Sequence, residues 1–162
     1  MSDIKAAYGS ETTFTVTNLH SLASSATAGW QSAAVDNTSD KFQDAMVYAV
    51  LDFANTSPAN SRGCFLYAYS GIGSSYTNPA SGSEGTITLL DVTANPQNLR
   101  FLGFIPYTTA DEVVESAHFS VAQAFGGLLP QKWGVVLINH TGAALAASGN
   151  TVKWYGVYST VV

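Results

Sequence analysis

The C-terminal third of this chain, residues 119–162, constrains the fold more than any other segment. Two runs of β-type residues, Trp133–Asn139 and Thr151–Val161, flank a loop of small residues, His140–Asn150. The second run carries aromatic residues and reaches the C-terminus without a polar tail. Because exposed termini are normally polar and unpaired strand edges invite association, we expect this end to be paired and buried. The pattern predicts a compact β-sandwich, completed by its own strands or by neighbouring subunits.

Runs of the same kind recur along the chain at spacings of roughly ten to fifteen residues, separated by Gly, Pro, Asn and Ser. The two C-terminal runs are preceded by seven more predicted strands: Thr12–Asn18, Trp30–Val35, Lys41–Ala54, Cys64–Ser70, Thr86–Val92, Leu99–Tyr107 and Ala117–Val121. Between them, Gly71–Gly85 is expected to be a long surface loop and Ala122–Leu129 one short helical turn. This rhythm indicates an all-β fold, an antiparallel β-sandwich of jelly-roll type with eight or nine strands. Residues 1–162 are predicted to form a single domain, with residues 1–11 as a candidate N-terminal arm.

The segment Lys41–Ala54 fits two different periods. Its apolar residues, among them Phe42, Met46 and Phe53, fall at helical spacing. The same residues also form two alternating faces of a long strand, and an apolar run of this length does not decide between the two. The strand interpretation agrees with the surrounding β pattern, so we predict a strand.

The chain is poor in charge and rich in small polar residues. Charged residues make up 10%, against a usual share of about 25%, while 18 Ser and 16 Thr supply much of the polar surface. Low charge weakens repulsion between molecules. This suits a protein that works inside an assembly, although a secreted β-domain has a similar composition.

Charge and hydropathy also exclude several function classes. The net charge is −5 and no run of basic residues occurs, which argues against binding nucleic acid or anionic membranes. No apolar leader and no stretch of about 18 apolar residues is present, so neither a signal peptide nor a membrane span is predicted. The single cysteine, Cys64, lies in an apolar run. We expect a buried thiol and synthesis in a reducing cytoplasm.

Histidines and acidic residues are the first candidates for chemistry. His20, His118 and His140 are far apart and lack neighbours at metal-ligand spacing, so each is expected to be structural. Two acidic groups occur, Asp36, Asp40 and Asp44 at intervals of four, and Asp111, Glu112 and Glu115. The first lacks the calcium-loop pattern and suits turns and solvated strand positions, and the second suits a solvated loop.

No nucleophile motif or phosphate loop is present either. The sequence therefore predicts a protein that is not an enzyme, with no catalytic, cofactor-binding or metal-binding residues.

Aromatic residues offer the remaining candidate site. Two groups, Tyr67 with Tyr69 and Tyr76, and Trp154 with Tyr155 and Tyr158, contain enough rings for a sugar-stacking platform. Core packing and subunit contacts are the commoner uses of such residues.

From Ile4 to Val162 the chain resembles the small jelly-roll capsid decoration proteins of tailed bacteriophages, also called cement or head-stabilising proteins. The resemblance is carried by the opening IKAAYGSETTFTVTNLHSLASSATAGWQSAAVDNTSDKFQDAMV and the close FSVAQAFGGLLPQKWGVVLINHTGAALAASGNTVKWYGVYSTV. It implies a β-sandwich on the capsid surface of a virion, usually a homotrimer, bound to the major capsid protein and without enzymatic activity. It assigns no functional residues.

Three hypotheses follow for the function. The first is a decoration protein, synthesised in the host cytoplasm, that binds the assembled shell and stabilises it by bridging coat subunits in many copies. The second is a carbohydrate-binding or receptor-binding module of a tail or spike, which requires a groove with exposed aromatic residues beside Asp or Asn. The third is an enzyme on a jelly roll such as a cupin, which the scattered histidines disfavour.

Overall fold

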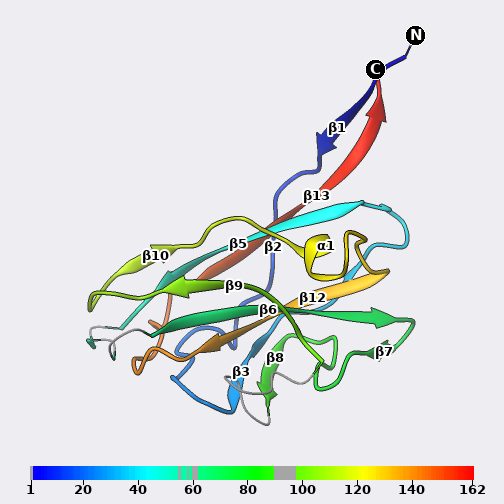
Figure 1. Ribbon diagram of the computed structural model, residues 1–162. Helices are drawn as coiled ribbons and strands as arrows, with labels where there is room; N and C mark the ends of the chain where they lie inside the picture. The colour runs from blue at the N-terminus through cyan, green and yellow to red at the C-terminus, as the bar shows by residue number, and fades with distance from the viewer. Residues whose placement is uncertain (1, 55, 58, 60–61, 90–97) are drawn as a thin grey trace.

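The computed structural model describes residues 2–54, 56–57, 59, 62–89 and 98–162. Within them the chain is almost entirely β-structure, folded as two antiparallel sheets that form a sandwich (Figure 1). The predicted all-β sandwich is confirmed. The described residues contain 13 strands and one short helix. The strands outnumber the eight or nine predicted because several are fragments of two or three residues.

The first sheet has six strands: β1 (Ile4–Tyr8), β2 (Thr12–Thr13), β5 (Asp44–Asp52), β10 (Val113–Glu115), β11 (Phe119–Ser120) and β13 (Thr151–Val161). β13 and β5 pair with each other in the middle. β1 and β2 both pair with the outer side of β13, while β10 and β11 both pair with the outer side of β5. The sheet is therefore four strands wide.

The second sheet has seven strands: β3 (Ala28–Gln31), β4 (Val35–Asp36), β6 (Gly63–Ile72), β7 (Ser75–Tyr76), β8 (Gly85–Thr88), β9 (Arg100–Pro106) and β12 (Lys132–Asn139). β6 and β12 form its centre. β3 and β4 flank β12, β9 and β7 flank β6, and β8 extends the sheet beyond β3.

The strand order is that of a jelly roll. Eight strand positions remain when β1 is merged with β2, β3 with β4 and β10 with β11, and when the additional strands β7 and β8 are set aside. We number these eight positions along the chain. Read across each sheet, their spatial order is 1-8-3-6 in the first sheet and 2-7-4-5 in the second. This double Greek-key order places the N-terminal and C-terminal strands side by side.

The strand β5 resolves the ambiguity of Lys41–Ala54. Alternate residues from Ala45 to Leu51 are fully buried, and the residues between them are half-buried. This is the period of two that a strand imposes. β13 on one side and β10 with β11 on the other bind its backbone. The strand prediction is confirmed and the helical alternative is wrong.

The main hydrophobic core lies between the two sheets. Trp30 from β3, Leu51 from β5 and Trp133 from β12 are fully buried in it. The ring of Trp133 lies edge-on to the rings of Phe14 and Trp154, with centroid distances of 6.0 and 5.3 Å. Since burying one large apolar side chain contributes about 1.5–3 kcal/mol, this cluster is a main source of stability.

A second apolar cluster covers the outer face of β6 and β12. Its buried members are Tyr67, Tyr69, Ile87, Leu89, Leu99, Val136 and Ile138. Tyr76 and Ala80, from the predicted surface loop Gly71–Gly85, pack against it. The segment lies on the surface, as predicted, but it is not only a loop, because it contains β7, which pairs with β6, and because Tyr76 and Ala80 are partly buried against the sheet. The sequence around these residues has no regular alternation of apolar and polar residues that would have predicted their burial.

The short helix α1 (Val121–Ala124) confirms the helical turn predicted within Ala122–Leu129, one residue earlier than expected. The side chain of Ser120 caps it by accepting a hydrogen bond from the backbone of Gln123. Gly126 and Gly127, both with positive φ, follow the helix and turn the chain. The predicted strand Ala117–Val121 is reduced to β11 because the helix takes Val121.

The predicted strand Thr86–Val92 corresponds to β8, which ends at Thr88. Residues 90–92 of that prediction lie outside the described part of the chain.

Candidate functional site

The most unusual feature of the surface is a two-stranded projection, here called the terminal ribbon, made of β1 and residues 157–161 of β13. The strands pair in register from Ile4 opposite Val161 to Tyr8 opposite Val157. β5 accompanies β13 only as far as Val157. Figure 1 shows that the ribbon leaves the sandwich and carries both chain ends at its tip. It therefore stands outside the two-layer core.

The terminal ribbon is apolar and open to solvent. Ile4 is 75% exposed, Tyr8 67% and Val161 70%. Ile4 is the register partner of Val161 and lies four residues from Tyr8, an even number, so the three side chains share one face of the ribbon. Ala6, Val157 and Ser159 lie on the same face. The prediction that the C-terminal end is paired is confirmed, but the prediction that it is buried is wrong. Pairing came from β1, which satisfies one edge of the strand without covering its faces.

The predicted N-terminal arm, residues 1–11, contains β1. A strand was not predicted there, because Ala6, Ala7 and Tyr8 are consecutive and the segment lacks a clear alternation of apolar and polar residues.

A mixed aromatic and charged group lies on the outer face of the first sheet. This outer-face cluster consists of Tyr8, Glu11, Tyr48, His118, Lys153 and Tyr155. The ring of Tyr155 lies 5.9 Å from that of Tyr8 and 6.1 Å from that of His118, and the rings of His118 and Tyr48 are 4.9 Å apart. A shallow hollow of about 250 Å³ is lined by Tyr8, Gly9, Glu11 and Tyr155. The cluster thus has ring surfaces beside a carboxylate.

An ion pair holds the charged part of this cluster. Nζ of Lys153 donates to Oε1 of Glu11 at 2.7 Å, and lies 5.9 Å from the ring centre of Tyr48. The hydrogen bond from Lys153, helped by its charge and by the Tyr48 hydroxyl, lowers the pKa of Glu11. The same hydrogen bond raises the pKa of Lys153. Both side chains reach solvent, so the pair orients the cluster more than it stabilises the fold.

The three histidines are not brought together. His118 belongs to the outer-face cluster, His20 lies 3.2 Å from the amide of Asn150, and His140 lies beside Phe65. Among the described residues, no group of three or more His, Cys, Asp or Glu side chains could hold a metal ion. His118 lies one residue before β11, at the edge of the predicted strand, and its ring contacts those of Tyr48 and Tyr155 on the surface.

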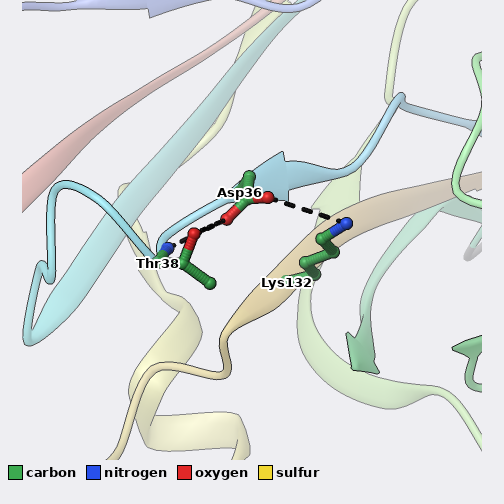
Figure 2. A network of polar contacts seen from close by, with 3 residues as sticks. All are labelled: Asp36, Thr38 and Lys132. Carbon is green, nitrogen blue, oxygen red and sulfur yellow. Dashed lines mark hydrogen bonds and ion pairs between the residues drawn. The ribbon is translucent and has the colours of Figure 1, made fainter. Parts of the chain in front are cut away.

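The acidic residues at intervals of four have separate structural roles. Figure 2 shows Asp36 accepting hydrogen bonds from the backbone and hydroxyl of Thr38, at 2.9 and 2.6 Å, with Nζ of Lys132 3.6 Å away. The bonds from Thr38, together with Lys132, lower the pKa of Asp36. Asp44 instead accepts from Ser120 and from the backbone of α1. Asp40 is exposed on a turn. The turn interpretation therefore holds for Asp36 and Asp40, while Asp44 anchors the helix.

The second acidic group is also local. The carboxylate of Glu112 accepts hydrogen bonds from the backbones of Thr109 and Thr108, which lower its pKa. Asp111 is exposed at positive φ in the same turn, and Glu115 is exposed on β10. This group shapes the turn before β10.

Neither of the two aromatic groups that the sequence offered as a candidate sugar-stacking platform forms an exposed surface, and core packing, the commoner use, applies to most of their rings. Tyr67 and Tyr69 are 6% and 0% exposed, and Trp154 lies in the main core while Tyr155 faces outward. Alternation along β13 separates Trp154 from Tyr155, so they cannot share a face. Sequence reasoning missed Tyr8, Tyr48 and the Glu11–Lys153 pair, which come together only through pairing of distant strands.

The single cysteine is buried, as predicted. Burial raises the pKa of the Cys64 thiol, which keeps it protonated and unreactive at neutral pH.

Comparisons with protein-family models, with curated proteins and with solved structures found no match to this chain. In the described part of the chain, no helix has the length and apolar character needed to cross a membrane.

Proposed function

We propose that this chain is a non-enzymatic structural protein of a bacteriophage virion, a decoration protein that binds the assembled capsid. The observation that carries the proposal is the terminal ribbon, whose apolar residues are largely exposed in the isolated chain. Two-stranded ribbons are only marginally stable in water without a surface to pack on. A surface of this kind is typical of a protein that completes its packing in an assembly.

The proposed partner is the major capsid protein. A protein that binds only the assembled shell stabilises it by mass action, by about 2.7 kcal/mol per site when its free concentration is 100 times Kd. Contacts repeated over many copies add avidity. The low charge of the chain, 10% of residues, favours apolar contact over electrostatic attachment.

The test is co-sedimentation of the purified protein with empty capsids assembled from the major capsid protein of the same genome. We expect saturable binding at a fixed copy number and a higher disassembly temperature of the shell. The double variant I4D/V161D places charges on the ribbon and should reduce binding at least about tenfold, whereas the exposed-loop variant A147D should bind normally. Failure of the unmodified protein to sediment with the capsids would contradict the proposal.

The outer-face cluster supports a second candidate, a carbohydrate-binding module of a virion tail or spike. Tyr8 and Tyr155 border a hollow that also contains the carboxylate of Glu11. Sugars pack their C–H faces on aromatic rings while carboxylates accept hydrogen bonds from their hydroxyls. A glycan array is the test, followed by Y155A with Y158A as the matched control. Binding that Y155A alone abolishes would favour this function, and a silent array would reject it.

A further inference from the structure

The outer edge of β1 presents unused backbone groups at alternate residues. Asp3 and Val162 exchange two backbone hydrogen bonds, of 3.1 and 2.9 Å, and Gly9 donates to Gly156 at 2.8 Å. In an antiparallel ladder, hydrogen-bonded and non-hydrogen-bonded residue pairs alternate. The backbone N–H and C=O groups of the odd-numbered residues of β1 are therefore directed toward β13. The N–H and C=O groups of Ile4, Ala6 and Tyr8 therefore point the other way. Within the described residues, no strand pairs with that side of β1.

This edge is complementary to itself. If two copies pair antiparallel about Ala6, Ile4 of each lies opposite Tyr8 of the other, and all three outward-facing residues exchange hydrogen bonds. Pairs of an aromatic with a β-branched residue are favourable across strands. Lys5, the one charged residue of β1, then lies opposite Ala7 rather than opposite a like charge. The pairing brings the side chains of Ile4 and Tyr8, which are among the most exposed large apolar side chains of the described structure, into cross-strand contact with each other.

We propose that β1 is a self-association edge that joins two copies of this chain in a continuous sheet of order β13–β1–β1–β13. Antiparallel pairing places the two sandwiches at opposite ends of this four-stranded sheet. Such a contact is isologous and generates a twofold axis, so the free protein is a homodimer. The family resemblance implies a homotrimer instead. The inference concerns the free chain and does not depend on binding to a capsid.

The first test is the mass of the purified protein by light scattering over a range of concentrations. We expect a dimer, twice the 17.0 kDa of the chain, that dissociates on dilution. A6K places two lysines directly opposite each other and should raise the dimer dissociation constant about tenfold or more. A147K makes the same substitution at an exposed position outside the ribbon and should leave the constant unchanged. A monomer at all concentrations, a trimer, or a dimer indifferent to A6K would overturn the proposal.

The second test measures the register. In a hydrogen-bonded antiparallel pair the two Cα atoms are about 5.5 Å apart, within the range that a disulfide spans. A6C should therefore form a disulfide-linked dimer under mild oxidation. In I4C the two cysteines are offset by four residues, about 13 Å along the strands, and should stay reduced. The unmodified chain, whose Cys64 is buried, is the control. Equal cross-linking of I4C and A6C, or none of A6C, would refute this register.

Discussion

The two halves of β13 have similar compositions and different environments. From Thr151 to Val157 the strand pairs with β5, and Val152 and Trp154 are buried in the core. From Tyr158 to Val161 its described strand neighbour is β1, and Val161 is mostly exposed. Both halves are rich in β-branched and aromatic residues. Strand-forming composition therefore favours an extended backbone in both halves, while the number of layers that cover the strand determines whether its side chains are buried.

Hydrogen exchange should reveal the largest difference between the halves. Amides between Thr151 and Val157 lie within the paired core and should open only on global unfolding. Amides between Tyr158 and Val161 should open locally at little cost, because few buried contacts hold them. The measurement is amide exchange by NMR, made at a dilution where the chain is monomeric. Equal protection of the two halves would contradict the description of the ribbon as a separate, weakly held unit.

Truncating an aromatic side chain in each half gives the next largest difference. W154A removes a ring packed against Trp133, Phe14 and Phe42, and should lower the free energy of unfolding by about 3–5 kcal/mol. Y158A removes a partly exposed ring and should cost less than about 1 kcal/mol. Urea denaturation of both variants measures the two values. Similar losses would mean that the ribbon contributes to the core.

Gly156 lies in the core half, one residue before its end at Val157, and its packing can be tested by adding one methyl group. A Cβ at this position would overlap the ring of Phe42, which packs directly on the strand there. G156A should therefore cost about 1–3 kcal/mol through overpacking. G85A is the matched control, because a Cβ at Gly85 on β8 meets open space. A neutral G156A would show that Phe42 moves aside without cost.

The smallest predicted effect concerns the Glu11–Lys153 pair, which fastens the N-terminal segment to the core half of β13. Because the pKa of Glu11 in the folded chain lies below its ordinary value of 4.5, the pair stabilises the fold above that pH. This contribution is lost as the pH falls below 4.5 through the lowered pKa. E11Q should therefore flatten the dependence of the urea midpoint on pH between 5 and about 3. K153M should flatten it equally, and the double variant no further. A pH dependence unchanged in both variants would show that the pair does not stabilise the fold.

Local sequence pattern was enough to predict most of the sandwich. The alternation of β5, the turn residues around α1 and the apolar runs of β6, β9 and β12 appear at the expected places. These features depend on residues close in the chain, whose backbone preferences and side-chain period are set locally. The exceptions are short strands such as β2 and β7, where pairing partners rather than composition create the extended backbone.

The candidate site was much harder to predict. Glu11 and Lys153 are 142 residues apart in sequence, and Tyr8 and Tyr155 meet only because the first and last strands of the jelly roll are neighbours. From the sequence, Tyr8 and Glu11 were assigned only to the candidate N-terminal arm, and Lys153 and Tyr155 only to the last predicted strand. Their meeting depends on topology, which a single-sequence pattern does not specify.

Composition and residue pattern were enough to identify a low-charge all-β chain, a sandwich fold and a strand in its last segment. Three features depend on the packing of distant segments: this strand ends outside the core, Tyr76 and Ala80 pack on the second sheet, and Tyr67 and Tyr69 are buried. The physical reason is that alternation specifies two faces for every strand but not what lies against each face. That assignment comes from pairing and layering between segments distant in the chain.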